Sequence, residues 1–212
     1  HLLSRRQRQM CIRDSTKKLH NMATVIRSMA ETNGRFHTIL GVSEIENRLV
    51  LEDLVSQPEI ASANYQIVHY DGPDVRGVDV GLLYRPDQFT YLDSESIPFD
   101  FNSSKIEFMM SGEARTKFKT RDILMVHGLI DGEHFAFYVA HLPSRIGGKG
   151  WDLRSRGAEI IYEHSMKMME KMQTILQMLP PDAMPFDGNG NSTDPDALSH
   201  MFEVFSAMQH MS

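Results

Sequence analysis

Acidic side chains stand at the end of a short apolar segment early in the chain. The run from His37 to Ser43 is long enough for a buried strand, and Glu44 and Glu46 follow it. Strand ends are where functional sites gather in layered α/β proteins. Mg²⁺ keeps several waters and needs few carboxylates, so Glu44 alone could begin a metal site. A glutamate at a strand end is, however, more often simply solvated.

A second polar group follows the strongest apolar segment, which runs from 134 to 142. His141 stands near the end of that segment, and Ser144, Arg145 and the pair Gly147-Gly148 come directly after it. Imidazole, hydroxyl and guanidinium groups hydrogen-bond phosphoryl oxygens, and glycines let backbone amides approach an anion. The pattern predicts a phosphate-binding rim. The alternative is a strand-end histidine before an ordinary glycine-rich loop.

Arg121 opens the strand that is predicted to precede this segment. The two segments are joined by Asp131-Gly132, a dipeptide that favours two-residue hairpin turns. Antiparallel pairing through that turn would bring Arg121 to the same rim as His141, where its guanidinium could clamp a phosphate. A lone strand-end arginine is otherwise usually a solvated charge.

The elements that must position these residues follow from the spacing of apolar side chains. Helical periodicity is found in four segments, at 16–33, 48–55, 151–179 and 194–205. Strands are predicted at 37–43, 66–70, 78–84, 89–92, 122–130 and 134–142. Helices and strands alternate early, whereas antiparallel strands dominate the middle. The predicted fold is therefore α/β of the α+β kind, two mixed and largely antiparallel sheets packed together with helices outside, a four-layer αββα sandwich.

The first fifteen residues look foreign to this pattern. They start without Met, carry four of the arginines and the only cysteine, Cys11, and show neither helical nor strand periodicity. They resemble the conceptual translation of a sequencing adapter, so the sequence predicts a non-native or disordered leader at 1–15 and one partial domain at 16–212. A disordered basic arm is the alternative.

Charge and composition narrow the class of protein. The chain has 212 residues, 41% hydrophobic and 24% charged, which suits one soluble globular domain. Without the leader's four Arg and one Asp, 22 basic and 28 acidic residues become 18 and 27, a net charge of −9. Such acidity argues against a large phosphate-neutralising surface. No apolar run is long enough to span a membrane. Neither localisation nor oligomeric state is indicated.

The order of these motifs resembles the endonuclease/exonuclease/phosphatase family, which has a DNase I-like fold. The resemblance runs from about Leu19 to Phe202 and is carried by GVSEIEN, DVRGVDVGLLYRP, TRDIL and YVAHLPSRIGG. It places Glu44 on the family's metal-binding glutamate, with Ser43 where the family has Gln. It also places Arg121 on a phosphate-contacting arginine and His141 on the first catalytic histidine.

The resemblance implies an incomplete catalytic set. In the Gly-Asp-Phe-Asn motif of the family, the Asp orients or deprotonates the attacking water and the Asn contacts the phosphate. This chain has Gly188-Asn-Gly-Asn191, so Asn191 matches but Asn189 replaces the Asp, and an amide cannot accept a proton from water. The family's opening strand and its closing Asp-His pair have no counterpart here, which implies truncation at both ends.

Two functions follow from the resemblance. The first is hydrolysis of phosphoesters, nuclease-like, with Mg²⁺ or Mn²⁺ at Glu44 and a phosphate-containing substrate, nucleic acid among the candidates. The second is a catalytically silent relative that binds a phosphate ligand or a protein partner, favoured by Asn189. Sequence error from Pro180 onward is a third explanation of the altered motif. The residues do not distinguish nucleic acid, lipid and small phosphoester substrates.

Overall fold

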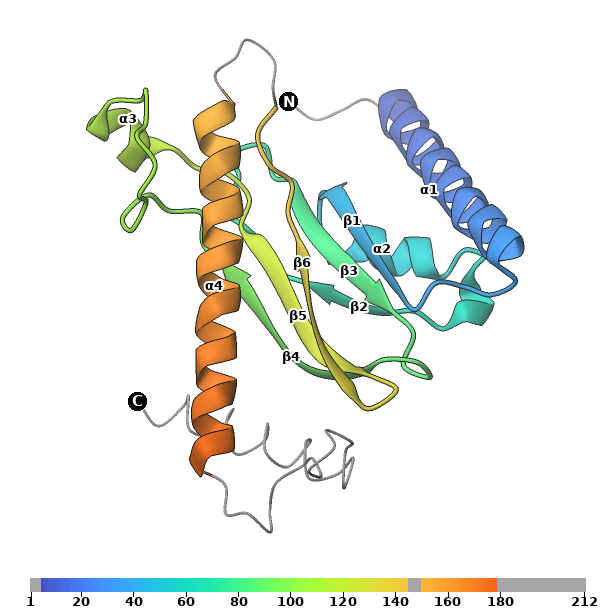
Figure 1. Cartoon of the computed structure of the whole chain (residues 1–212). Coiled ribbons are helices and arrows are strands. Elements are labelled where there is room, and N and C mark those ends of the chain that lie inside the picture. Colours follow the sequence, from blue (N-terminus) through green and yellow to red (C-terminus); the bar gives the residue numbers. More distant parts are fainter. Residues whose placement is uncertain (1–4, 145–149, 179–212) are drawn as a thin grey trace.

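A computed structural model describes residues 5–144 and 150–178, with side chains from Thr16 on apart from those of 175, 176 and 178. Within these described ranges, six strands form two sheets of three, and every pairing between neighbouring strands is antiparallel. Helices lie on the outside of this pair of sheets (Figure 1). The fold is thus α+β, as the sequence predicted, although the sheets are antiparallel rather than mixed.

In the first sheet, the strand that comes last in the sequence lies between the other two. The sheet contains β1 (Ile39–Ile45), β2 (Gln66–His69) and β3 (Asp79–Tyr84), in the order β1-β3-β2. The central strand, β3, is buried along almost its whole length. A strand covered on both faces must be apolar without alternation, and Val-Gly-Leu-Leu meets that requirement.

The second sheet is a meander of β4 (Thr90–Ile97), β5 (Ile123–Ile130) and β6 (Glu133–Val139). Ile130 pairs with Glu133, so Asp131 and Gly132 alone make the turn between β5 and β6. Both turn residues have positive φ, 52° and 81°. These values are typical of a type I′ hairpin turn, so the hairpin predicted from Asp-Gly is confirmed.

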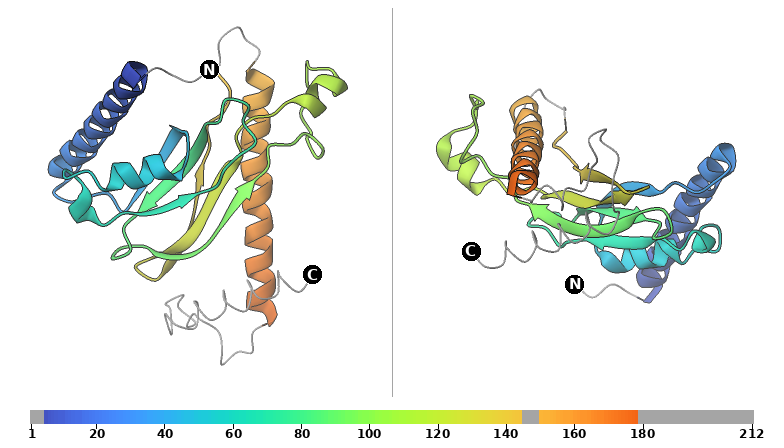
Figure 2. Two further views of the ribbon diagram at one scale, coloured as in Figure 1. Left: turned by 180° about the vertical axis from the view of Figure 1, so that it is seen from behind. Right: turned by 60° about the horizontal axis from the view of Figure 1, so that its bottom comes forward.

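Three apolar clusters hold four layers together. On the outer face of the first sheet, α1 (Arg5–Asn33) and α2 (Arg48–Val55) pack through a cluster that includes Leu19, Leu51 and Leu83. Between the two sheets lies a cluster that includes Leu82 and Val126. On the far side, α4 (Trp151–Met178) covers the second sheet through Ile97, Ile123, Met125 and Ile160. Figure 2 shows the layers from two further sides.

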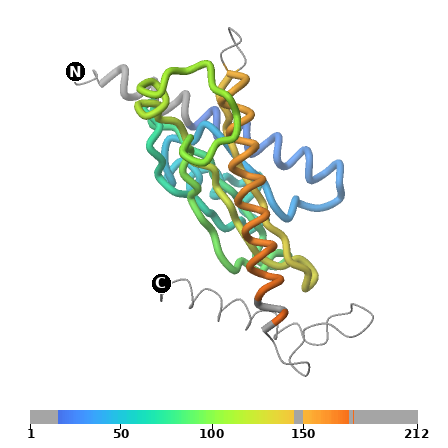
Figure 3. The backbone as a smooth tube through the Cα atoms, turned by 60° about the vertical axis from the view of Figure 1, so that its left-hand side comes forward, coloured from blue at the N-terminus to red at the C-terminus, as the bar shows by residue number. Residues whose placement is uncertain are grey.

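Some elements differ from the prediction. The backbone of α1 is helical from Arg5, not from Thr16, because Arg, Gln and Met favour helix even without an apolar face. The packing expected of the first fifteen side chains lies outside the described residues, and so does the helix predicted at 194–205. Two short helices, η1 (Ala61–Ala63) and α3 (Gly112–Lys117), were not predicted, because neither has apolar periodicity in the sequence. Figure 3 follows the long excursion between β4 and β5 that contains α3.

None of the helices in the described ranges combines the length and the apolar character needed to cross a lipid bilayer.

Candidate functional site

Glu44 occupies a β-bulge at the end of β1. The pairing with β3 shifts register between Ser43 and Ile45, so Glu44 has no partner in the ladder. Its φ is 61°, a left-handed conformation that costs a non-glycine residue about 1 to 3 kcal/mol. Bulges of this kind redirect a side chain, and the Glu44 side chain is 69% exposed. The bulge therefore turns this carboxylate out of the sheet towards solvent.

His141 meets Glu44 from the other sheet. Strand β6 ends at Val139, three residues before the predicted end at residue 142, so His141 lies in the segment that follows the strand. The Nε2 atom of His141 is 3.7 Å from Oε1 of Glu44. Its Nδ1 atom is buried and has no hydrogen-bond partner among the described residues. The structure thus brings the predicted metal ligand and the predicted catalytic histidine together at one end of the two sheets.

A shallow groove leads to this pair. It runs between β1 and β6 and is lined by residues that include Gly41, Ser43, Val139 and Ala140. A methyl group built on Gly41 would lie 3.3 Å from Val139, so the two strands approach closely there. Two of the lining residues, Ser43 and Ala140, directly precede Glu44 and His141 in the chain, so the groove lies next to this pair, although neither residue of the pair lines it.

Arg121 lies beside this site but faces inward. Its Nη1 atom is 3.4 Å from the backbone oxygen of His141, which is the proximity expected from the hairpin. Its Nε atom, however, is 3.1 Å from Oδ2 of Asp74, and both side chains are only 6% exposed. The contact is an ion pair rather than an aligned hydrogen bond, because Nε has no acceptor in hydrogen-bonding geometry. A buried guanidinium requires such a counter-charge.

The open phosphate clamp expected at Arg121 is therefore occupied by Asp74 in this conformation. The sequence interpretation missed Asp74, although it lies in the turn-rich stretch Asp71-Gly-Pro-Asp-Val-Arg-Gly77. Of the other predicted site residues, Ser144 is exposed. Arg145, Asn189 and Asn191 lie outside the described residues.

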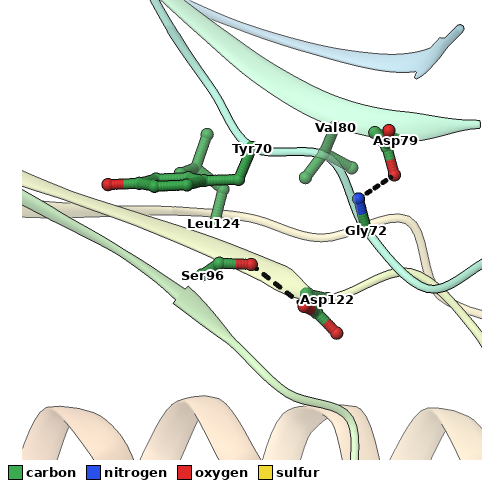
Figure 4. Close-up of a pocket in the computed structure, with 7 residues that line it drawn as sticks. All are labelled: Tyr70, Gly72, Asp79, Val80, Ser96, Asp122 and Leu124. Atoms are coloured by element: carbon green, nitrogen blue, oxygen red, sulfur yellow. Dashed lines mark hydrogen bonds between the residues drawn. The ribbon is translucent and has the colours of Figure 1, made fainter. Parts of the chain in front are cut away.

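A second polar cluster lies next to Glu44 on the neighbouring strand. Asp79, the first residue of β3, pairs with Ile45 across the ladder and is buried. Burial raises the pKa of its carboxyl group, while a hydrogen bond from the Gly72 amide, 3.0 Å from Oδ1, acts in the opposite direction. Figure 4 shows this bond and, across a small cavity, the bond from Ser96 to Asp122. Sequence reasoning did not single out Asp79.

Two packed antiparallel sheets between outer helices, with a carboxylate and an imidazole together at one end, fit the DNase I-like class of proteins. The model of the Endonuclease/Exonuclease/phosphatase family matches residues 3–174, and the chain belongs to this family. The name of the family covers endonucleases, exonucleases and phosphatases. The match begins within the predicted leader, whose boundary at residue 15 stays a prediction.

Solved structures of D. rerio TDP2 are similar to part of the chain. One, complexed with a single-strand DNA product, is 17% identical with a TM-score of 0.40, over 61% of this chain and 42% of that chain. Another, humanized by 14 mutations, is 15% identical with a TM-score of 0.40, over 77% and 55%. The chain thus spans about half the length of these structures. No curated protein matches it significantly.

Proposed function

We propose that this chain carries the site of a divalent-metal-dependent phosphodiesterase of the nuclease-like kind. The observation that supports it most directly is the 3.7 Å approach of His141 Nε2 to Glu44 Oε1, between residues 97 positions apart in sequence and on different sheets. The Glu44 side chain is not needed there for packing, since it is mostly exposed and sits on a strained bulge. Strain of this kind is concentrated at functional sites.

The residues present suit a Mg²⁺ or Mn²⁺ ion. Glu44 offers an accessible carboxylate, and Mg²⁺ is commonly held by one or two carboxylates with several waters. When bound, such an ion polarises a phosphoryl oxygen and makes water a better nucleophile. His141 is then placed to donate a hydrogen bond to a phosphoryl oxygen. In this proposal Ser144 and Arg145 supply further contacts to phosphate, and Asn191 contacts the scissile group.

Arg121 joins the site only by exchanging partners. Its guanidinium already binds the Asp74 carboxylate, so a phosphate must displace that carboxylate to be clamped. The exchange keeps the buried guanidinium paired with an anion, while the released Asp74 carboxylate has to turn towards solvent and the exposed Arg76, which already lies 3.6 Å from its Oδ1. We expect Asp74 therefore to act as a stand-in for the phosphate when no substrate is bound.

The same ion pair supports a second candidate, a catalytically silent relative. An Arg121 permanently neutralised by Asp74, together with Asn189 in place of the expected base, would leave a rim that binds ligands without hydrolysing them. Asn189→Asp distinguishes the two candidates. A gain of hydrolysis would show that activity was lost through this one substitution, and no gain would favour a binding role.

The activity test uses the full-length protein. Hydrolysis of single-stranded DNA and of bis(p-nitrophenyl) phosphate is followed with and without Mg²⁺ or Mn²⁺. We expect Glu44→Gln and His141→Ala each to lower the rate by about 100-fold or more. Glu46→Gln is the matched control, because Glu46 is equally exposed two residues away. Hydrolysis of neither substrate, with no divalent cation bound, would falsify the proposal.

A further inference from the structure

A histidine and an aspartate are buried together on neighbouring strands of the first sheet. His69 pairs with Gly81 in the ladder, and Asp79 is two residues before Gly81, so both side chains are on the same face. Nε2 of His69 is 3.7 Å from Oδ2 of Asp79, and the two side chains are only 2% and 8% exposed. This pair shares no residue with the Glu44 and His141 site.

His69 lacks what a buried imidazole normally has. Its Nε2 atom has no hydrogen-bond partner among the described residues, although it is shielded from solvent. Leaving a buried polar atom without a hydrogen-bond partner destabilises the folded state. The atom is directed at the Asp79 carboxylate, yet 3.7 Å is too long for a hydrogen bond. This spacing leaves room for a bridging atom between the imidazole and the carboxylate.

A third ligand group completes the arrangement. Asp71 offers a carboxylate oxygen. One ring nitrogen of His69 and one carboxylate oxygen each of Asp71 and Asp79 all lie within 4.8 Å of one another. Ligand atoms around a tetrahedral Zn²⁺ at about 2.0 to 2.1 Å are roughly 3.3 Å apart, so modest side-chain rotations would bring them into place. Asp71 is exposed and can make most of that movement.

Charge also favours a cation here. Asp71 and Asp74 both act on Asp79 as nearby negative charges, and of the three only Asp74 is paired with Arg121. Oδ1 of Asp79 accepts a hydrogen bond from the Gly72 amide (Figure 4). That leaves Oδ2, which lies 3.7 Å from Nε2 of His69. A methyl group on Gly72 would come within 2.7 Å of Asp79 Oδ1, so this close approach depends on glycine.

We propose that His69, Asp71 and Asp79 form a second metal site, which binds Zn²⁺ or a similar divalent transition ion. One imidazole and two carboxylates suit zinc better than magnesium, which prefers oxygen ligands alone. Three protein ligands leave a position for water. Asp71 lies directly before the loop 72–78 and Asp79 directly after it, so a bound ion would hold this loop against the sheet. The loop carries Asp74, and the ion would therefore also hold in place the carboxylate that pairs with Arg121.

The test is Zn²⁺ binding by the 212-residue chain after treatment with a chelator. Calorimetric titration should detect one equivalent at this site, and Co²⁺ used as a spectroscopic probe should show visible absorption from a bound imidazole and carboxylates. His69→Gln and Asp79→Asn should each weaken that binding by at least about tenfold, because losing even an outer-shell partner of a metal site costs that much. His20→Gln is the control, since it removes an imidazole 2.8 Å from Glu59 elsewhere.

Exposed Asp71 keeps the test decisive if the buried variants do not fold. Asp71→Asn disturbs no core packing and should weaken Zn²⁺ binding by a similar factor. Glu44→Gln should leave this equivalent intact while it removes hydrolysis, so the two proposals can fail separately. Absence of Zn²⁺ binding, or binding unchanged in both Asp71→Asn and whichever buried variant folds, would overturn the second site.

Discussion

Two imidazoles are held against each other at the turn end of β5 and β6. Nε2 of His127 is 3.1 Å from Nδ1 of His134, and the rings stack with their centroids 5.2 Å apart. Burial, reinforced by the neighbouring His134, lowers the pKa of His127 from 6.5 to about 4. Burial also lowers the pKa of His134. The folded protein therefore keeps His127 neutral at pH values where an unfolded chain would protonate it.

This pair gives the first prediction, a loss of stability in mild acid. Between pH 6.5 and about 4 the unfolded chain binds a proton that folded His127 does not, so the free energy of unfolding falls as pH falls. The contribution of neutral His127 to the free energy of unfolding is fully present above pH 6.5, and up to about 3 kcal/mol of it is lost by pH 4. Urea unfolding at a series of pH values measures it.

His127→Leu should flatten the pH dependence in that window, because leucine has nothing to protonate. The exposed His20 provides the comparison, since His20→Gln should leave the slope close to that of the unmodified chain. Equal slopes for all three proteins would contradict the prediction.

The sequence pattern and the family resemblance together predicted that Glu44 and His141 would meet, and the two side chains lie 3.7 Å apart. Glu44 and His141 were found because each follows a clear strand, and strand ends are where side chains from different sheets can meet. Asp74, Asp79 and His69 were missed because their significance depends on burial and on partners from other strands. A sequence shows that Asp74 is a turn residue, but only the packed fold shows that it neutralises Arg121.

Among the elements, the β5–β6 hairpin is the one whose sequence most fully specifies its geometry. Both residues of the turn need left-handed backbone conformations, and Asp-Gly is one of the few dipeptides that adopt them at low cost. The helices predicted at 48–55 and 151–179 were also close to the observed bounds. Strong periodicity or specific turn chemistry explains each success.

Gly132→Ala tests how far this turn stabilises the second sheet. Gly132 has φ of 81°, where an L side chain costs about 1 to 2 kcal/mol. We expect a loss of that size in the free energy of unfolding, although no atom lies within 4 Å of the added methyl group. Thermal and chemical denaturation measure it.

Gly112→Ala is the control for the turn. It also has open space around the added methyl group, but its φ is not in the left-handed region and it lies in α3. Alanine favours helix over glycine, so this substitution should be neutral or slightly stabilising. If the two variants were equally stable, backbone conformation at the turn would not be the cause.

Elements without periodicity could not be predicted in this way. The helix α3 has six residues and none of them is buried, so no apolar pattern marks it. It begins at the capping residue Ser111, whose hydroxyl accepts from the Ala114 amide, a signal too common in loops to be decisive alone. The start of α1 was missed for the same reason, since the helix continues there without an apolar stripe.

On the scale of the whole molecule, the four layers followed from the sequence because each face of each sheet needs a cover. The sequence did not show how α4 is attached to the rest of the molecule. A segment rich in phenylalanine, 99–118, lies against this helix, with ring contacts such as Phe101 on Phe108 at 4.8 Å. Polar groups of α4 bind its backbone, including Asp152 to the Met109 amide and Glu159 to the Lys105 amide.

Arg156 is the centre of this attachment, and its loss gives the last prediction. Its side chain is 2% exposed and binds the Asp100 backbone oxygen as well as the carboxylates of Glu159 and Glu163. Arg156→Met leaves those carboxylates uncompensated, so we expect a loss of about 2 kcal/mol or more in the free energy of unfolding. Amide hydrogen exchange and proteolysis should increase first in 99–118. Lys117→Met, which breaks an exposed ion pair, should change neither measurement, and equal effects of both variants would refute the argument.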